Sequence, residues 1–387
     1  MKKATYILLV LLPIISFSQT YTPGTTYFGT NNYTEYQAGN MPLILSSPHG
    51  GYLTPSTIPD RNCIGCVTGR DSYTQELTRE VANVIKAKTN CFPHVIINKL
   101  HRKKLDANRE IIEATDSNAS SYIYWNEYNN FIDSARENIK NKTTKGLFVD
   151  IHGHGHSIQR IEIGYLLSKS TLQQSNLFLD SINQINKSSI KNLSQNNLLS
   201  YSHSNLIRGT NSLGTMLSNK GYPSVPSTSI PFPLSSESYF NGGYNTVKWG
   251  SRNGGEIDGI QLEHNQNIRF DSTLRKNYAD SLAVVLLDYL EKHYFVNFSS
   301  NYCFTNSLKE IKLSKIKIFP NPSKDFITIK TTEDITKITL YDITGKLVLT
   351  ELKSKKLIIS SLKKGVYFMK LDYKTKYLNT FHKIIKE

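Results

Sequence analysis

The chain has 387 residues, of which 39% are hydrophobic and 20% charged. These proportions are typical of a globular protein and exclude a disordered or membrane-embedded one. The formal net charge is +15, but residues 301–387 alone hold 18 lysines, no arginine and eight acidic residues, a balance of +10. The central part of the chain therefore lacks the clustered Lys and Arg of a nucleic-acid-binding face, which argues against that class of function.

The N-terminus has the pattern of a secretory signal peptide. Lys2 and Lys3 supply a positive start, an apolar run covers residues 6–17, and small residues near Ser18 offer a cleavage site. The apolar run is too short to span a bilayer. We expect residues 1–18 to be removed, and the mature chain to be secreted without a transmembrane segment.

Residues 21–295 mix two kinds of pattern. Short apolar runs at 43–45, 95–97, 147–151 and 260–262 predict buried strands, and helical periodicity covers residues 75–86 and 278–294. Strands that alternate with helices favour an α/β fold, with a mixed sheet flanked by helices. In such sheets, functional residues gather at the carboxyl ends of the strands.

Four cysteines in a secreted chain are able to pair. The spacing Cys63-Ile-Gly-Cys66 favours a small structural disulfide loop over a redox-active pair, and one such pair is too few for a zinc ribbon. The sequence leaves the pairing of Cys91 and Cys303 open.

Histidines follow two of the predicted strands. His49 lies in Ser-Ser-Pro-His-Gly-Gly, and His152, His154 and His156 are separated by single glycines. Imidazole is the commonest nitrogen ligand of zinc, and an Asp-x-His arrangement allows Asp150 to support His152 from behind. A hydrogen-bonded loop histidine and an incidental His-rich loop are the alternatives.

Acidic residues near these histidines have two interpretations. Asp71 precedes a predicted helix, where it could cap the helix or supply an oxygen ligand to zinc, with Glu76 as the reserve ligand. Glu263 lies within a buried strand pattern, where a carboxylate is costly unless it is paired or acts as a general base.

Residues 105–109 read Leu-Asp-Ala-Asn-Arg, and Arg102 lies just upstream. An arginine side chain binds a substrate carboxylate through two hydrogen bonds. Arg109, with Asn108 beside it, is therefore a candidate carboxylate anchor. A surface salt bridge is the alternative.

The order of these motifs resembles the N-formylglutamate amidohydrolase family, which is related to zinc carboxypeptidases and aspartoacylases. The motifs are Pro-His-Gly-Gly at 48–51, Asp71, Asp-Ala-Asn-Arg at 106–109, Asp-Ile-His-Gly at 150–153, Phe-Asn-Gly-Gly-Tyr at 240–244 and Gln-Leu-Glu at 261–263. The resemblance covers residues 42–271 and implies a zinc carboxypeptidase-like fold.

It also implies roles for individual residues. Zn²⁺ would be held by His49, an acid placed here at Asp71, and His152. Glu263 would be the general base, Asn108 and Arg109 would grip a substrate carboxylate, Arg102 would lie near that carboxylate or the scissile carbonyl, and Tyr244 in a flexible turn would close over the substrate.

The chain differs from what the family would lead one to expect in two respects, the position of the acidic ligand and the cellular location. The carboxypeptidase relatives carry their acidic ligand three residues after the first histidine, where this chain has Tyr52. Formylglutamate is a cytoplasmic metabolite, so a secreted member is expected to cleave another N-acyl amino acid or a peptide. A secreted zinc carboxypeptidase-type exopeptidase and a non-catalytic surface-binding protein are the alternatives.

Residues 316–387 differ in character from the rest. Short β-prone runs alternate with Gly and Asn-Pro turns, which predicts a small antiparallel β-sandwich after a polar linker at 296–315. Phe-Pro-Asn-Pro-Ser at 319–323, Leu-Tyr-Asp-Ile-Thr-Gly-Lys at 340–346 and Gly-Val-Tyr-Phe at 365–368 resemble the type A sorting domain of Bacteroidetes type IX secretion. The resemblance implies contact with that machinery, export through the periplasm and outer membrane, and removal of the tail. A carbohydrate-binding or adhesive sandwich is the alternative.

Overall fold

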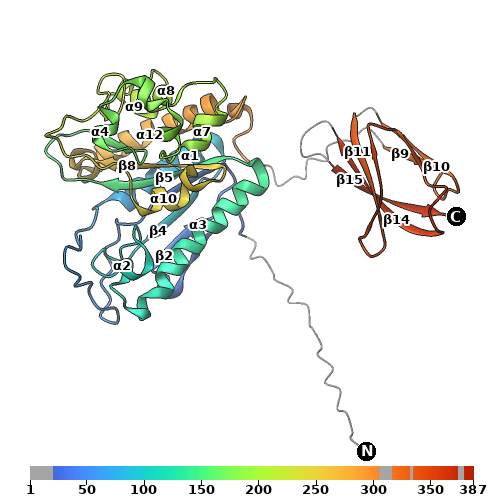
Figure 1. The fold of residues 1–387 in the computed structure, drawn as a ribbon. Helices are drawn as coiled ribbons and strands as arrows, with labels where there is room; N and C mark the ends of the chain where they lie inside the picture. The colour runs from blue at the N-terminus through green and yellow to red at the C-terminus, as the bar shows by residue number, and fades with distance from the viewer. Residues whose placement is uncertain (1–20, 305–315, 332–333, 374–378) are drawn as a thin grey trace, which may run out of the picture. The chain divides into compact units, whose positions relative to one another are not determined.

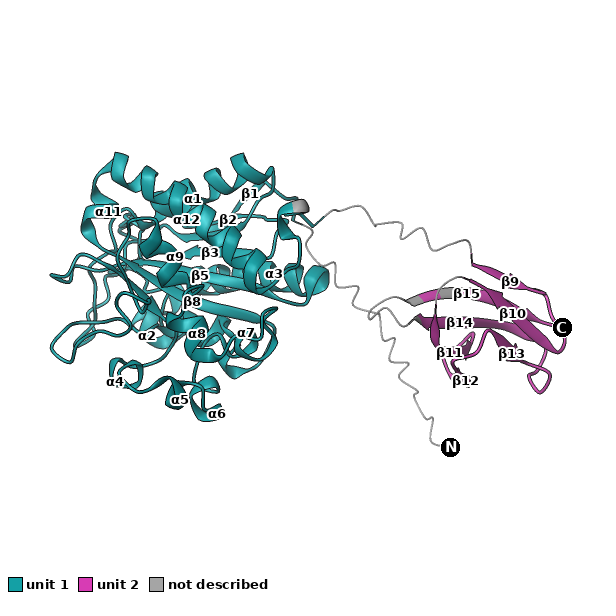
Figure 2. Ribbon diagram, turned by 90° about the horizontal axis from the view of Figure 1, so that it is seen from above, with its two compact units in different colours: residues 1–304 teal, residues 305–387 magenta. Residues whose placement is uncertain are grey.

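The computed structural model describes residues 21–304, 316–331, 334–373 and 379–387. The predicted signal peptide at 1–18 lies outside this range, as does the second part of the predicted linker. The chain divides into two compact units, Met1–Phe304 and Thr305–Glu387 (Figure 2).

The first unit is built on an eight-stranded mixed sheet (Figure 1). The strand order is β1-β2-β4-β3-β5-β8-β6-β7. Strands β4, β3, β5 and β8 are parallel to one another, and β2 and β6 flank them antiparallel. The strands are β1 (Thr26–Phe28), β2 (Thr34–Gln37), β3 (Leu43–Ser47), β4 (His94–Asn98), β5 (Gly146–Gly153), β6 (Ile161–Gly164), β7 (Ser224–Val225) and β8 (Ile257–His264).

Helices fill most of the connections between these strands. They are α1 (Thr74–Thr89), α2 (Ile111–Thr115), α3 (Tyr122–Thr143), α4 (Lys169–Leu172), α5 (Asn176–Leu179), α6 (Ile182–Ile185), α7 (Lys191–Asn196), α8 (His203–Arg208), α9 (Leu213–Asn219), α10 (Tyr244–Trp249), α11 (Gln266–Phe270) and α12 (Ser272–His293). Short 3-10 turns lie at Thr30–Asn32, Ala119–Ser121, Ser251–Asn253 and Phe298–Ser300.

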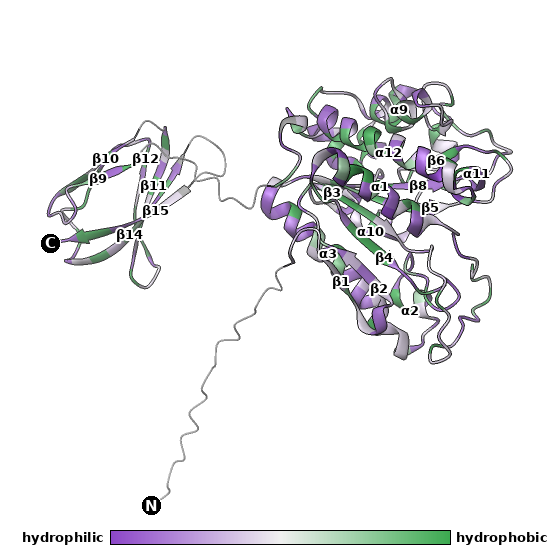
Figure 3. Cartoon of the chain, turned by 180° about the vertical axis from the view of Figure 1, so that it is seen from behind, coloured by the Kyte–Doolittle hydropathy of each residue, from purple (hydrophilic) through white to green (hydrophobic). Residues whose placement is uncertain are grey.

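Each face of the sheet has its own hydrophobic core, because successive side chains of a strand point to opposite faces. Leu43 and Leu45 pack on the face that α1 and α12 cover, whereas Ile44 packs with α3 and α10 on the other. Figure 3 shows hydrophobic colouring on parts of the central strands, and hydrophilic colouring where polar residues interrupt them. The predicted fold class, an α/β sheet flanked by helices, is confirmed.

The parallel strands bring several predicted site residues to one edge of the sheet. His49 follows β3, His152 lies near the end of β5, and Glu263 lies near the end of β8. His152 is directly opposite Glu263 in the β5–β8 pairing, and Glu263 is opposite Glu162 in the β8–β6 pairing. Residues in register point to the same face, so these three side chains form a row across neighbouring strands.

Two disulfides join the cysteines of the first unit. The predicted Cys63–Cys66 loop is confirmed, and Cys91 pairs with Cys303. The second bond changes the expected boundary. The catalytic part was predicted to end at residue 295, but the unit extends to Phe304, because the Cys91–Cys303 bond and the buried Phe298 ring hold this segment against the body.

A buried carboxyl in β8 gives the first unit a pH-dependent stability. Ser251 Oγ (2.6 Å), Leu193 N (3.1 Å) and Tyr294 Oη (3.1 Å) all donate to Asp258. Burial raises the pKa of Asp258 to about 6, despite those hydrogen bonds. Between its unfolded pKa near 4 and pH 6, the native state thus binds more protons than the unfolded state, and stability falls as pH rises.

Asp258→Asn is therefore expected to gain stability relative to the unmodified chain as pH rises from 4 to 7. The relative change should be about 2–3 kcal/mol, and most of it should occur below pH 6. Urea unfolding of both proteins at several pH values measures this difference. A difference that stays constant across the window would contradict the expected role of Asp258.

The second unit consists of two antiparallel sheets with one core between them. The sheet orders are β13-β10-β9 and β12-β11-β14-β15. The strands are β9 (Lys317–Phe319), β10 (Phe326–Lys330), β11 (Ile335–Asp342), β12 (Leu347–Leu352), β13 (Lys356–Ile358), β14 (Gly365–Tyr373) and β15 (Asn379–Lys386). The predicted sandwich is confirmed. Strand β15 was missed, because its residues are largely polar and Ile384 is its one fully buried hydrophobic side chain among those described.

None of the helices in the described parts of the chain combines the length and hydropathy needed to cross a membrane.

Candidate metal centre

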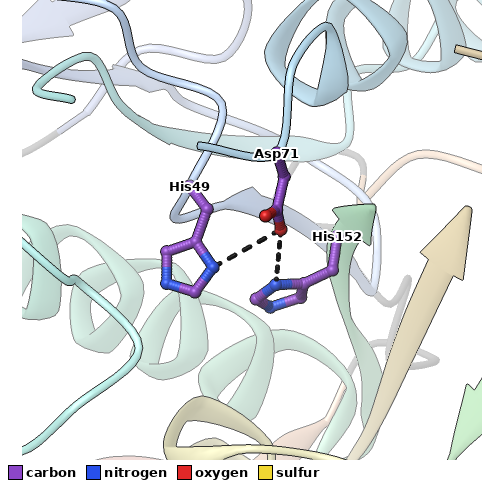
Figure 4. A group of neighbouring side chains, drawn as sticks. All are labelled: His49, Asp71 and His152. Carbon is purple, nitrogen blue, oxygen red and sulfur yellow. Dashed lines mark hydrogen bonds and ion pairs between the residues drawn. The ribbon is translucent and has the colours of Figure 1, made fainter. Parts of the chain in front are cut away.

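His49, Asp71 and His152 lie together at the carboxyl edge of the sheet, buried from solvent (Figure 4). Asp71 Oδ2 is 3.4 Å from His49 Nδ1 and 3.2 Å from His152 Nδ1. The backbone fixes the carboxylate, because Asp71 N donates to the His49 carbonyl (3.0 Å) and Gly153 N donates to Asp71 Oδ2 (3.1 Å). One oxygen and two nitrogens thus converge from three separate segments.

A second carboxylate stands behind each histidine. His49 Nε2 is 2.6 Å from Asp106 Oδ1, and His152 Nε2 is 2.8 Å from Asp150 Oδ2. When Nε2–H donates to a carboxylate, the Nδ1 lone pair is left free, and this is how proteins orient histidine ligands of metals. His49 Nδ1 is buried and makes no hydrogen bond with any described residue. A cation bound at this position would satisfy the free lone pair of His49 Nδ1.

The spacing of the three atoms fits zinc. Tetrahedral coordination with metal–ligand distances of about 2.0–2.1 Å separates neighbouring ligand atoms by roughly 3.3 Å. The two measured separations from Asp71 Oδ2 are 3.4 and 3.2 Å, and all three atoms lie within 4.8 Å of one another. Two histidines and one carboxylate are also a donor set that leaves a position for water or substrate.

The charges of this group are strongly coupled. Burial alone would raise the pKa of the Asp71 carboxyl, but the hydrogen bonds and charges of His152 and His49 outweigh it and hold that pKa well below the usual value. Burial alone would lower the pKa of His152, but Asp150 and Asp71 outweigh it and raise that pKa. The Asp106 pKa is likewise lowered by His49 and Arg102 in spite of burial. The neighbouring cationic groups therefore favour the ionised form of Asp71 and of Asp106.

The position of Asp71 differs from that of a helix cap. The N-cap of α1 is Tyr73, in a left-handed conformation with φ of 66°, and the Asp71 side chain does not cap the helix. Glu76, the reserve ligand, is not part of the convergent group, and its Oε2 is buried without a hydrogen bond.

Glu263 lies beside the group, 4.0 Å from His152 Nδ1 through its Oε1. Gln261 Nε2 donates to the same oxygen at 2.9 Å. Burial raises the pKa of Glu263 to about 8, partly offset by His152 and reinforced by the negative charge of Asp71 and Glu162. A buried carboxylate with a raised pKa next to a candidate metal is suited to accept and return a proton.

The predicted arginines lie on the loop after β4. Arg102 Nε donates to Asp106 Oδ2 (2.8 Å), and its Nη1 is 4.0 Å from Asp71 Oδ1. Arg109 instead pairs with Glu113 of α2, at 2.7 Å, with a third of its side chain exposed. Asn108 Nδ2 lies 3.5 Å from His152 Nε2. Arg102 and Asn108 thus touch the candidate metal group, whereas Arg109 lies outside it.

A cavity of about 250 Å³ opens between Arg109, Asp106 and the Cys63–Cys66 loop. Sequence reasoning missed Arg61 at its wall. This buried guanidinium donates to the carbonyl oxygens of Arg102 (3.0 Å) and Val67 (3.3 Å), and so ties the disulfide loop to the arginine-bearing loop. An arginine next to a Cys-x-x-Cys loop was the available signal.

Tyr244 was predicted to lie in a flexible Gly-Gly turn, but in the structure it begins a helix directly after the two glycines. Tyr244 is the first residue of α10, with its ring 6.4 Å from that of Trp125 and 5.5 Å from Lys248 Nζ. The glycines before it are held in place: a Cβ at Gly243 would lie 2.5 Å from Asn108 Nδ2. Close backbone approach to Asn108, rather than mobility, accounts for the glycine there.

The other two histidines of the His-rich segment, His154 and His156, make different hydrogen bonds. His154 Nδ1 accepts from His156 N (3.1 Å), and His154 Nε2 donates to the Arg160 carbonyl (2.8 Å), so both ring nitrogens are satisfied. His156 Nδ1 is 2.9 Å from Glu162 Oε1. Although these three side chains are close enough to hold an ion, His154 has no free lone pair to offer one.

Asp106 is the supporting residue to which the sequence analysis assigned no role. Asp106→Asn removes the charge that orients His49, so we expect zinc affinity to fall about 10–100-fold while the protein stays folded. Competition with a fluorescent zinc chelator measures this change. Asp60→Asn, which breaks ion pairs with Lys103 and Lys104 at the surface, is the matched control and should leave zinc affinity unaltered; equal affinities in all three proteins would exclude the role of Asp106.

The chain is similar to several solved structures at low sequence identity. No curated protein matches the chain. Among solved structures, N-formylglutamate amidohydrolase from Ralstonia eutropha JMP134 aligns with 12% identity over 70% of this chain and 97% of its own, with a TM-score of 0.40. A gene product from Agrobacterium tumefaciens aligns with 11% identity over 68% and 98%, also with a TM-score of 0.40. PorZ, a type-IX secretion component of Porphyromonas gingivalis, aligns with 16% identity over 21% and 12%, with a TM-score of 0.18.

The C-terminal unit has a family match. Residues 317–387 match the secretion system C-terminal sorting domain family, as the motifs of the tail predicted. The chain therefore carries a C-terminal sorting domain for secretion and is exported to the cell surface or the extracellular space.

Proposed function

We propose that this protein is a secreted zinc-dependent amidohydrolase that cleaves the amide bond of an N-acyl amino acid or peptide bearing a carboxylate. The observation that carries the proposal is the convergence of His49 Nδ1, Asp71 Oδ2 and His152 Nδ1, each histidine backed by a carboxylate, with Glu263 alongside. Structural zinc sites usually have four protein ligands, whereas catalytic sites keep a position open.

His49, Asp71 and His152 would hold the zinc ion. Zinc bound there would supply Lewis-acid chemistry, polarising the scissile carbonyl and lowering the pKa of water. The protein's own contribution is to fix these three side chains from behind: Asp106 and Asp150 orient the imidazoles, and the backbone N–H of Gly153 holds the Asp71 carboxylate.

Glu263 would move the protons of the reaction. Its carboxylate takes a proton from the attacking water and returns it to the amide nitrogen as the C–N bond breaks, leaving a carboxylic acid and an amine. Its carboxyl group is buried beside His152, with one oxygen held by Gln261 Nε2 at 2.9 Å, and a carboxyl fixed in this position can both accept a proton and return it.

The two arginines would act on opposite parts of the substrate. Arg102 lies against the group, 2.8 Å from Asp106 and 4.0 Å from Asp71, and would stabilise negative charge that develops on the carbonyl oxygen. Arg109 and Asn108 would hold the substrate carboxylate, with the adjoining cavity of about 250 Å³ for the rest of the amino acid. Tyr244, at the start of α10 beside Asn108, would cover this end of the substrate.

Export would proceed through a signal peptide at residues 1–18 and the type IX secretion machinery, which would act on the matched tail at 317–387.

Metal analysis and hydrolysis assays test the proposal. The purified secreted protein should contain about one zinc per chain and hydrolyse N-formyl, N-acetyl or peptide substrates. A chelator should abolish the activity and zinc should restore it. Activity confined to C-terminal residues of peptides would identify an exopeptidase. Absence of bound zinc together with absence of metal-dependent hydrolysis of every substrate would overturn the proposal.

A further inference from the structure

The candidate site occupies one end of a longer row of side chains. The loop after β4 carries Arg102 and Asn108. His49 follows β3, His152 lies on β5, and Glu263 lies on β8. The next strand, β6, begins with Ile161, and its Glu162 is in register with Glu263. The arginines and Glu162 thus lie on opposite sides of the candidate metal group.

Glu162 supports an aromatic pair at this far end. The carboxylate is fully buried, and its two oxygens are satisfied by His156 Nδ1 (2.9 Å) and by the backbone N–H of Phe240 (2.8 Å). The rings of His156 and Phe240 stack with centroids 4.7 Å apart and planes 20° apart. Phe240 is nevertheless 45% exposed. We call this pair the His156–Phe240 shelf.

The segment that carries Phe240 also reaches the arginine side of the site. Asn241 O accepts from Leu166 N (2.6 Å) beyond β6, and Asn245 N donates to Asn108 Oδ1 (2.7 Å) at the other end. A single short segment, residues 240–245, therefore spans the site from the shelf to Asn108. Its contacts at both ends hold the shelf in a fixed position relative to the candidate ligands.

We propose that the His156–Phe240 shelf binds an aromatic group on the acyl side of the substrate. The inference rests on the proposed function, because it places the amino-acid carboxylate at Asn108 and Arg109 and the scissile amide at the candidate metal group. A substrate in that orientation directs its acyl group over β8 towards β6. A large aromatic side chain left half exposed beside a binding site, with its ring already stacked on one side, offers its other face to a planar ligand.

The distance from the candidate metal group to the shelf indicates how large an acyl group must be to reach it. From His152 on β5 to Glu162 on β6 there are two strand spacings, roughly 10 Å. An acetyl group adds only one C–C bond of about 1.5 Å beyond the carbonyl carbon. Formyl and acetyl groups therefore end short of the shelf, whereas an aroyl group or an aromatic residue of a peptide extends towards it.

Binding to the zinc-free, chelator-treated protein tests the shelf independently of catalysis. Dissociation constants would be measured by calorimetry for N-acetyl-glutamate, N-benzoyl-glutamate and N-acetylphenylalanyl-glutamate. At least one aromatic ligand should bind about tenfold more tightly than the acetyl ligand, a difference of about 1.4 kcal/mol. Tighter binding of N-benzoyl-glutamate would indicate an aroyl amino acid as substrate. Tighter binding of N-acetylphenylalanyl-glutamate would indicate a peptide.

Substitutions locate the effect. Phe240→Ala and Phe240→Leu, the second of which keeps an apolar side chain without an aromatic face, should reduce the preference to about twofold or less. Phe28→Ala, which removes a similarly exposed phenylalanine from β1 at the far side of the sheet, should retain it. Equal binding of all three ligands, or a preference that survives both Phe240 substitutions, would overturn the inference.

The tests distinguish failure of the shelf from failure of the proposed function. Hydrolysis of the acetyl ligand without any aromatic preference would overturn the shelf and leave the amidohydrolase intact. Aromatic preference in binding that depends on Phe240, without metal-dependent hydrolysis of any ligand, would support the shelf and overturn the enzyme.

Discussion

Replacing both His49 and His152 by alanine is expected to reduce bound zinc from about one ion per chain to none, and to abolish amide hydrolysis. The reason is that the double variant leaves Asp71 as one remaining ligand of the group, and a single carboxylate does not hold zinc at the micromolar free concentrations of an assay. Elemental analysis after dialysis measures the metal, and the loss of activity should exceed about a thousandfold because the metal's Lewis-acid chemistry is lost with it.

His203→Ala is the matched control for this pair. His203 is as buried as His49, but it lies on α8 and its Nδ1 hydrogen-bonds the Leu179 carbonyl at 2.7 Å. Its loss should lower thermal stability without changing zinc content. Undiminished zinc in the folded double variant would refute the assignment of the metal to this group.

Glu263→Gln is expected to lower kcat about 10²–10⁴-fold while zinc stays bound, because the amide keeps the size of the side chain but cannot accept the proton. Gln261 Nε2 donates to Glu263 Oε1 at 2.9 Å, and a glutamine oxygen can accept that bond. The variant should therefore fold normally. Steady-state kinetics together with elemental analysis separate loss of the base from loss of the metal.

Asp258→Asn provides the control within the same strand. Asp258 is also a fully buried carboxyl of β8, but its partners are Ser251, Leu193 and Tyr294 rather than the candidate ligands. This variant should alter the pH dependence of stability and leave kcat within about twofold, as expected for a change outside the site. A Glu263→Gln protein as active as Asp258→Asn would remove Glu263 from the mechanism.

The candidate metal ligands show which parts of the site can be predicted from local sequence patterns. His49 and His152 could be selected from the sequence because each follows a short apolar run, and the ends of parallel strands meet at one edge of a sheet. The sequence did not show whether Asp71 or Glu76 is the acidic ligand, or whether Asp71 instead caps the helix. That choice depends on the His49 carbonyl and the Gly153 N–H, which position the Asp71 carboxylate from two other segments.

Two further differences between the sequence-based expectations and the structure have the same cause. Adjacent glycines before Tyr244 suggested a flexible turn, but Gly243 packs against Asn108, which is distant in sequence. The boundary at residue 295 followed a change to polar composition, but the chain remains attached to the first unit up to Phe304 through the Cys91–Cys303 bond. In both cases a long-range contact overrides the local composition.

The sequence by itself determined the α/β class, the sandwich and sorting motifs of the tail, the Cys63–Cys66 loop and the segments that carry the candidate site, because hydrophobic periodicity and turn residues act locally. Only the tertiary structure decided which acid joins the two histidines, which carboxylates stand behind them, and that Glu162, His156 and Phe240 form a shelf beyond Glu263. Those arrangements depend on strand order and register, which pair residues that are distant along the chain and whose local sequence carries no record of their partners.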